Sequence, residues 1–261
     1  MITHLRIELE KNIQTDGSFV DNIILVEEAR DNIIKFSSNE PEIIYKIINN
    51  QEHSLPHIIY AKPYNNIISI YGLGDNGANG INAIFKNVIM NQTFKIKNEI
   101  YKLKGIPTIE SNIDLLPYNN GRMNTYTTIT PINIFNTFNH KIFKFMLYKH
   151  FKDGNFDKND TEKVKSFYDD IKNYANEQIK DSIAYITSTL LKKEKDYFEF
   201  ISKIEIEWED IKIIHGKYHS EEKKMPMIKG KFRSNFVLPK FVGYKIGKGF
   251  GELSLKDSYK I

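Results

Sequence analysis

Four glycines crowd the stretch GYKIGKGFGEL, residues 243–253, in a chain of 261 residues that has only 14 glycines. They are Gly243, Gly247, Gly249 and Gly251. Glycine adopts backbone conformations that other residues avoid, and it lets the backbone approach a partner closely. Lys245 and Lys248 lie among these glycines. The stretch therefore predicts either a loop whose amides and lysines bind phosphate groups or a tight turn without a ligand.

The cluster does not match the phosphate-binding loop of nucleoside triphosphatases. That loop has four residues between its first glycine and a Gly-Lys pair, and then a Ser or Thr that binds magnesium. Here three residues separate Gly243 from Gly247, and Gly249 takes the place of the hydroxyl residue. We therefore exclude a nucleoside triphosphatase.

A second glycine run, IYGLGDNGANG, has the G-x-G-x-x-G spacing of dinucleotide-binding proteins at Gly72, Gly74 and Gly77. Dinucleotide binding also requires a following apolar parallel strand that ends in an acidic residue. The next segment, residues 93–103, alternates apolar and charged residues, which is typical of an antiparallel strand. A Rossmann-type oxidoreductase remains an alternative, and a fluorescence titration with a nicotinamide cofactor tests it.

The basic charge is concentrated at the C-terminal end. Residues 211–261 contain eleven Lys and one Arg against four acidic residues, a net charge of +8, whereas the whole chain has +4. Such a segment is the expected footprint of a surface that binds a polyanion. The alternative is a solvated lysine-rich face in a chain that is rich in lysine throughout.

Residue types that are missing exclude several kinds of site. The chain has no cysteine, which excludes disulfides, thiolate zinc sites and cysteine nucleophiles. No apolar run approaches the roughly 20 residues of a membrane span, and the first residues have no signal-peptide core. We expect a cytoplasmic protein that has no membrane contact, no bound metal and no cofactor.

Hydrophobic periodicity predicts an α+β protein with two halves. Its first half has the order β-α-β-α-β-β, close to a ferredoxin-like order, with strands at 4–10, 66–72 and 93–105 and helices at 40–49 and 80–90. Its second half has a helix at 131–151, a long helix or a helix pair at 161–191, and strands at 203–213, 229–238 and 250–255. The boundary is expected near Thr130, which gives domains 1–130 and 131–261.

The last of these strands and its glycine loop resemble a known family. In KFVGYKIGKGFGEL, Gly243, Gly247, Gly249, Phe250 and Gly251 match the glycine-rich signature of CRISPR-associated endoribonucleases that process repeat RNA, within the RAMP superfamily. YTTITPINIF is similar to the family's mid-chain strand before a Ser-Pro pair, with Thr130-Pro131 here. The resemblance implies two tandem ferredoxin-like (RAMP/RRM-like) domains with a C-terminal glycine-rich loop for RNA binding and domain packing.

The resemblance also implies a reaction. Members of the family cut RNA without metal: the 2′-hydroxyl attacks the adjacent phosphate and leaves a cyclic phosphate and a free 5′-hydroxyl. This requires a base, an acid and a cation for the phosphorane charge. The family places its catalytic His in or just after the first helix, where this chain has NNQEHSLPHIIYAKPY. The candidates there are His57 as first choice for base or acid, His53 as second, Tyr60 to orient the phosphate or share proton transfer, and Lys62 to stabilise charge.

The other histidines rank lower, although His4 in the first strand would face a cleft between the domains. RNA binding is expected to depend on the phosphate backbone and on charge. The candidates are Lys229, Lys231, Arg233, Lys240, Gly243, Lys245, Gly247, Lys248, Gly249 and Gly251. Phe232 and Phe236 have strand spacing, which favours core packing over base stacking.

We therefore predict a metal-independent endoribonuclease that binds CRISPR repeat RNA and cuts the precursor transcript into guide RNAs. A monomer and a homodimer are both compatible with the sequence, and a CRISPR effector complex is a further candidate partner. The main alternative is a catalytically inactive subunit that uses the same fold to bind RNA within a ribonucleoprotein complex.

Overall fold

The structure is a computed structural model. It describes residues 2–13, 57–96, 99–111, 115–135, 140–151, 154, 156–191, 197–217, 224–244 and 246–256. His53, Lys245 and the predicted helix at 40–49 lie outside these residues. No helix of the described residues has the length and apolar character needed to cross a membrane.

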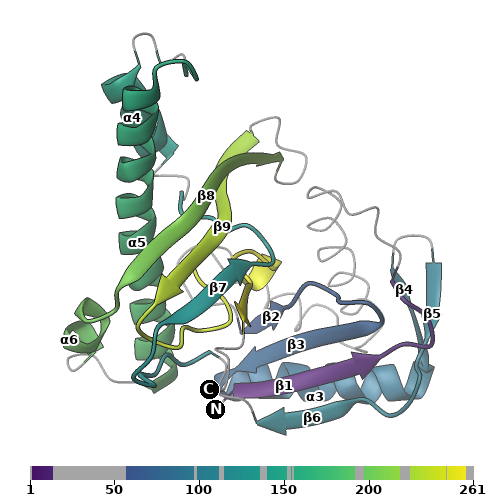
Figure 1. Ribbon diagram of the computed structural model, residues 1–261. Helices are drawn as coiled ribbons and strands as arrows, with labels where there is room; N and C mark the ends of the chain where they lie inside the picture. Colours follow the sequence, from purple (N-terminus) through teal and green to yellow (C-terminus); the bar gives the residue numbers. More distant parts are fainter. Residues whose placement is uncertain are drawn as a thin grey trace.

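The described residues contain two four-stranded antiparallel sheets, each with a long helix packed against one face (Figure 1). The first belongs to the N-terminal lobe, which we define as residues 2–111, and its strand order is β2-β3-β1-β6. The elements of this lobe are β1 (Ile2–Glu8), β2 (Ile58–Tyr60), β3 (Ile67–Leu73), α3 (Gly74–Asn91), β4 (Thr93–Ile96), β5 (Glu99–Lys102) and β6 (Thr108–Ser111). β4 and β5 form a separate two-stranded sheet.

Successive side chains of β1 point to opposite faces of the sheet, and the two faces contact different parts of the protein. Leu5 and Ile7 are buried in a cluster with Ile81 and Ile84 of α3, so this face of the sheet supports the helix. His4 stacks on Tyr71 of β3 on the opposite face. The sheet is therefore covered on both sides, by α3 on one side and by the other half of the chain on the second.

Two glycines of the G-x-G-x-x-G run, Gly72 and Gly77, allow close contact between β3 and α3. A Cβ at Gly72 would lie 2.4 Å from the carbonyl oxygen of Gly77, so strand and helix touch backbone to backbone here. All neighbouring strands of this sheet pair antiparallel. A dinucleotide-binding fold requires parallel strands, so the sheet does not support the Rossmann alternative.

The C-terminal lobe, residues 124–256, contains the second sheet in the order β10-β7-β9-β8. Its elements are β7 (Asn124–Thr128), α4 (His140–His150), α5 (Thr161–Leu191), α6 (Tyr197–Ser202), β8 (Ile206–Lys217), β9 (Lys224–Ser234), η2 (Ile246–Lys248) and β10 (Leu253–Lys256). Both sheets thus have the order last, first, third, second strand. β7 pairs with β10 and β9 in this sheet. If the chain is divided according to its two sheets, the boundary therefore lies before residue 124, ahead of the boundary expected near Thr130.

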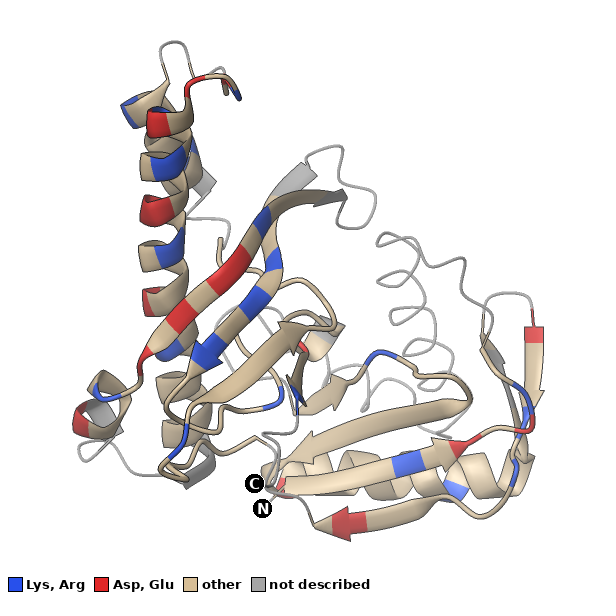
Figure 2. Ribbon diagram, viewed as in Figure 1, with Lys and Arg blue, Asp and Glu red and all other residues tan. Residues whose placement is uncertain are grey.

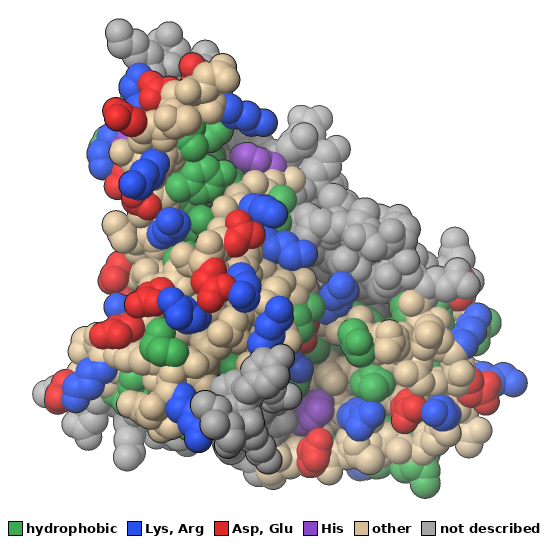
Figure 3. All heavy atoms as spheres, viewed as in Figure 1, with side chains coloured by type: hydrophobic (Ala, Val, Ile, Leu, Met, Phe, Trp, Pro, Cys, Tyr) green, Lys and Arg blue, Asp and Glu red, His purple; other side chains and the backbone are tan. Residues whose placement is uncertain are grey.

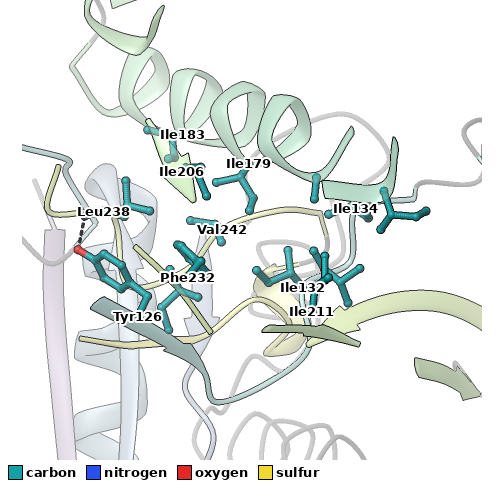
Figure 4. Close-up of a cluster of buried hydrophobic side chains, with 14 of the residues drawn as sticks. Tyr126, Ile132, Ile134, Ile179, Ile183, Ile206, Ile211, Phe232, Leu238 and Val242 are labelled. Atoms are coloured by element: carbon teal, nitrogen blue, oxygen red, sulfur yellow. Dashed lines mark hydrogen bonds between the residues drawn. The ribbon is translucent and has the colours of Figure 1, made fainter. Parts of the chain in front are cut away.

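The core of this lobe lies between the sheet and α5. Tyr126 and Phe232 stack on neighbouring strands and lie across from Ile179 and Ile183 of α5 (Figure 4). The Tyr126 hydroxyl accepts a hydrogen bond from the backbone N–H of Leu238 at 2.8 Å, which anchors the segment after β9. Phe232 and Phe236 are both buried, so they are core residues rather than surface stacking platforms.

The two lobes meet through a third buried cluster, which we call the lobe junction. It joins the open face of the first sheet to α5 and to the glycine-rich segment. Its buried members are Ile2, Ile59, Ala61, Tyr71, Leu73, Leu115, Ile186, Phe241 and Ile246. Phe241, two residues before Gly243, and Ile246, directly before Gly247, are thus buried in the contact between the lobes.

Candidate nucleic-acid interface

Lys62 lies at the lobe junction, where the chain leaves β2. Its neighbour Ala61 is buried in the junction cluster, and the Lys62 side chain is half-buried. The Lys62 backbone N–H donates a hydrogen bond to Oε2 of Glu252, from the other lobe, at 2.7 Å. A direct polar contact between the two lobes therefore holds this lysine.

Glu252 is a buried carboxylate, with only 3% of its surface exposed. Its Oε1 lies 3.6 Å from Nζ of Lys240, and this ammonium also lies over the ring of Tyr71, 5.4 Å from the centroid. Burial raises the pKa of Glu252, while Lys240 and the Lys62 backbone N–H oppose that rise. The Glu252 carboxylate, the Lys240 ammonium and the Tyr71 ring thus connect the glycine-rich segment to β3.

The environment of Lys62 favours loss of its proton more than that of a surface lysine. Burial lowers the pKa of Lys62, the ammonium of Lys229 on β9 lowers it further, and Glu252 partly offsets both. Lys229 comes from the C-terminal lobe, so a cation of each lobe contributes to the positive charge at this position. An anion such as a phosphate would relieve this repulsion.

The outer face of β9 is basic, but most of its charges are paired. Lys231 pairs with Glu209, and Arg233 lies 3.1 Å from Glu207, on neighbouring β8. Figure 2 shows acids along β8 beside basic residues along β9, and Figure 3 shows both signs interspersed on that surface. Lys229 forms no ion pair among the described residues, and its register partner on β8 is Lys212, a like charge. Lys229 is therefore the β9 cation best placed for a ligand.

A bulge in β8 explains this pairing. The register shifts between Trp208 and Asp210, which makes Glu209 the additional residue. Glu209 contacts Lys231 and also lies 3.5 Å from Nε of Arg233. The lysine and arginine of β9 lower the pKa of Glu209, with Lys231 the larger cause. Glu207 and Glu209 thus neutralise two members of the predicted RNA-binding set, Lys231 and Arg233.

The structure brings Lys62, Lys229 and Lys240 to the junction, but it separates two other candidates from them. His57 lies at the opposite end of β2, where its carbonyl oxygen accepts the N–H of Leu73. The Tyr60 side chain, 2% exposed, packs in the cluster under α3, on the sheet face away from the junction. The catalytic roles of His57 and His53 stay predictions.

His4 lies on the face of the first sheet that contacts the other lobe. From the sequence, His4 ranks low among the histidines and is expected to face a cleft between the domains. Its ring is parallel to Tyr71 at a centroid distance of 4.5 Å, and Nδ1 lies 3.2 Å from Glu110 Oε1. Sequence reasoning missed Glu252 and Tyr71. The strand parity of His4, which points away from Leu5 and Ile7, was the available signal for this face.

The glycine-rich segment uses several of its amides within the protein. The N–H groups of Gly243, Gly249 and Gly251 donate to Ser182 Oγ, the Ile246 carbonyl and the Pro131 carbonyl, at 2.8, 2.9 and 2.8 Å. All three glycines have positive φ. Gly247 and Lys248 lie in η2. These three amides are committed to the protein itself, so the predicted phosphate contacts of the loop depend on its other groups.

No group of three or more His, Cys, Asp or Glu residues that could hold a metal ion occurs among the described residues. The positive groups at the junction are side-chain ammoniums.

Comparison with known proteins gives the fold. No protein-family model and no curated protein sequence matches the chain. The structure is similar to a crystal structure of Cas6b, at a TM-score of 0.58 with 18% identity over 98% of each chain. A CRISPR RNA processing endoribonuclease Cas6b has a TM-score of 0.52 with 17% identity, covering 98% of this chain and 99% of its own.

A RAMP protein that binds different RNA substrates has a TM-score of 0.54 and 15% identity, covering 98% of this chain and 100% of its own. The chain has the fold of the Cas6 and RAMP proteins. The similarity covers nearly the whole chain.

Proposed function

We propose that the protein is an endoribonuclease that binds CRISPR repeat RNA and cuts the precursor transcript into guide RNAs without a metal ion. We also propose that each lobe is a ferredoxin-like domain, since both sheets have the same strand order. The observation that carries the proposal is the hydrogen bond from the Lys62 N–H to Glu252, which holds this lysine of one lobe against the other lobe at the junction of a Cas6-like fold. A solved structure with this fold is of a CRISPR RNA processing endoribonuclease, and another is of a protein that binds RNA.

In the proposed reaction the RNA supplies its own nucleophile. A base, with His57 or His53 as candidate, takes the proton of the 2′-hydroxyl, and the 2′-oxygen bonds to the adjacent phosphorus. The bond from phosphorus to the 5′-oxygen breaks, and that oxygen receives a proton from an acid. The products are a 2′,3′-cyclic phosphate and a 5′-hydroxyl. Lys62 stabilises the negative charge that develops on the phosphorane oxygens.

A cleavage assay tests this function. End-labelled repeat RNA is incubated with the protein in EDTA, and a substrate with a single 2′-deoxy group at the cut site is the control. We expect site-specific cutting in EDTA that the 2′-deoxy substitution abolishes. Cutting that needs a divalent ion or survives the 2′-deoxy substitution would contradict the mechanism.

Variants then assign the roles. Lys62→Ala should slow cutting by about 100-fold or more, in the range of a lost charge-stabilising group. His57→Ala and His53→Ala test the base. Lys104→Ala is the matched control, because this exposed lysine pairs with Glu8, away from the lobe junction.

One observation favours the second candidate, an RNA-binding subunit without activity. Two residues expected to act with Lys62 lie apart from it in the described structure. The Tyr60 ring is in the core, and His57 is at the other end of β2. Tight binding of repeat RNA that weakens with salt, without any cutting, would support this candidate.

A further inference from the structure

Glu252 is a buried acid for which the proposed reaction has no use. It lies directly after the last of the four clustered glycines, and its backbone is fixed in the C-terminal lobe. Its N–H donates to Thr130 Oγ1 at 2.8 Å, and its carbonyl oxygen accepts the N–H groups of Ile129 and Thr130 at 2.8 and 3.3 Å. The residue is therefore a rigid support, and only its carboxylate extends to the other lobe.

Burial of the ionised Glu252 carboxylate costs solvation free energy. An ionised group out of water loses solvation, and this loss is repaid only by good partners. Packing alone would be served as well by an apolar or amide side chain of similar size. The two partners of Glu252 are instead the backbone N–H of Lys62, at 2.7 Å, and the ammonium of Lys240, at 3.6 Å. The charge is directed at the cations of the lobe junction.

We propose that Glu252 is a positioning residue that fixes Lys62 at the lobe junction for contact with an RNA phosphate. The contact to the Lys62 N–H sets where the backbone leaves β2, and so where the side chain begins. The negative charge supports the ammonium of Lys62 beside Lys229. The role in cleavage rests on the proposed function, but the contact itself does not.

The charged groups around Lys62 set the direction of the effect. Lys229 and burial favour the neutral amine of Lys62, whereas Glu252 favours the ammonium. Lys240 also contacts Glu252 and lies over Tyr71. Neutralising Glu252 should therefore lower the pKa of Lys62 further. An RNA phosphate needs the ammonium, so cleavage should then be lost at a lower pH on the alkaline side.

The first experiment uses the unaltered protein. NMR follows the backbone amide proton of Lys62 through a pH titration of isotopically labelled protein. We expect this resonance to shift upfield in one step as Glu252 gains its proton, because the N–H loses a charged acceptor. A Lys62 amide that does not respond to the titration of Glu252 would overturn the proposal.

The second experiment uses Glu252→Gln, which keeps an oxygen acceptor and removes the charge. The titration of the Lys62 ammonium should move to lower pH, and single-turnover cleavage should fall about 10-fold to 100-fold, with a smaller change in affinity for the 2′-deoxy RNA. The alkaline limb of the cleavage profile should shift in the same direction. Glu199→Gln is the control, since Glu199 pairs with Lys203 in an exposed part of α6.

The outcomes separate the two proposals. If the unaltered protein cuts no RNA, the nuclease proposal fails, and the two titrations still decide whether Glu252 controls Lys62. If the unaltered protein cuts RNA and Lys62 titrates identically in Glu252→Gln, the positioning role alone is wrong. If Glu252→Gln does not fold, the titration of the unaltered amide decides.

Discussion

Gly251 has no room for a side chain. A Cβ there would lie 1.8 Å from the Val242 carbonyl oxygen, an atom of the backbone that cannot swing aside. The Val242 N–H donates a hydrogen bond to the Gly251 carbonyl at 3.0 Å, so the two segments are hydrogen-bonded as well as in van der Waals contact. At residue scale, the glycines of residues 243–251 serve packing first, because close backbone contact at Gly251 accompanies the burial of Phe241 and Ile246 against the other lobe.

Substitution of Gly251 by alanine tests this packing role. Gly251 and Gly121 both have φ of 72°, and a Cβ at Gly121 meets nothing within 4 Å. Gly121→Ala should cost only the strain of the left-handed backbone, about 1–2 kcal/mol of unfolding free energy. Gly251→Ala should cost about 1–3 kcal/mol more, because of overlap. Urea denaturation measures both, and equal losses would show that the segment relaxes without penalty.

The like charges at the junction make a second prediction. Removing Lys229 with Lys229→Ala should raise the pKa of Lys62 toward its ordinary value, because the neighbouring ammonium is one of the causes that lower it. NMR titration of the labelled lysines measures the change. Lys212→Ala removes the residue opposite Lys229 on β8 and is the control. An unchanged Lys62 in Lys229→Ala would mean that the two ammoniums do not interact.

Elements with strong periodicity were predictable from sequence, and elements without it were not. The apolar residues that recur through 161–191 predicted either one long amphipathic helix or a helix pair, and the structure has the single helix α5 over this range. Residues 131–151 were predicted as helix throughout, yet α4 begins at His140 and Ile132 instead bridges to Ile228. Within α4, Phe143 is buried, whereas Phe145 is 69% exposed. Aromatic residues on nearly every side of this segment concealed its true face.

The connection between α4 and α5 depends on Asp170. Its Oδ2 accepts from Nζ of Lys149 at 2.7 Å and lies 2.8 Å from Nε2 of His150. These contacts, with Lys149 first, lower the pKa of Asp170. A carboxylate with a lowered pKa stabilises the fold above its ordinary pKa, and this stabilisation is lost as the pH falls through the lowered value.

Asp170→Asn should therefore reduce the unfolding free energy at neutral pH by up to about 1 kcal/mol, in the range of partly exposed ion pairs. The difference from the unaltered protein should vanish in acid. Urea denaturation at neutral and acid pH measures this. Asp169→Asn is the matched control, because Asp169 pairs with Lys172 within α5 and not with α4. A difference that persists in acid would contradict the charge-based explanation.

At the scale of the whole molecule, two sheets of one strand order meet through a buried cluster that the sequence did not reveal. Periodicity predicted two α+β halves, and the structure confirms an arrangement with two antiparallel sheets. Which faces meet depends on contacts between residues far apart in sequence, such as Tyr71 with Phe241. Glu252 was invisible for the same reason: its role depends on Lys62, and a single acid in a glycine-rich turn resembles any solvated acid.

The junction cluster should be a main source of cohesion between the lobes. Phe241 is fully buried, and its ring meets the edge of Tyr71 at a centroid distance of 5.7 Å. Phe241→Ala should lower the unfolding free energy by about 3–5 kcal/mol, the cost of an aromatic cavity. Phe145→Ala, at an exposed site of α4, should change it by less than about 0.5 kcal/mol. If Phe241→Ala lowered the unfolding free energy as little as Phe145→Ala, the ring of Phe241 would not be needed to hold the lobes together.

The pairing of β10 with β7 has a consequence for how the chain is made. The first sheet has its last strand by residue 111, whereas β7 receives its partner β10 only at residues 253–256. At a translation rate of about 5 to 20 residues per second, the roughly 145 residues between them take about 7 to 30 seconds to emerge. Glu252 emerges at the end of this interval. A nascent chain therefore has Lys62 long before it has Glu252, the group proposed to position it, and the cationic site can be assembled only after residues 252–256 have been synthesised.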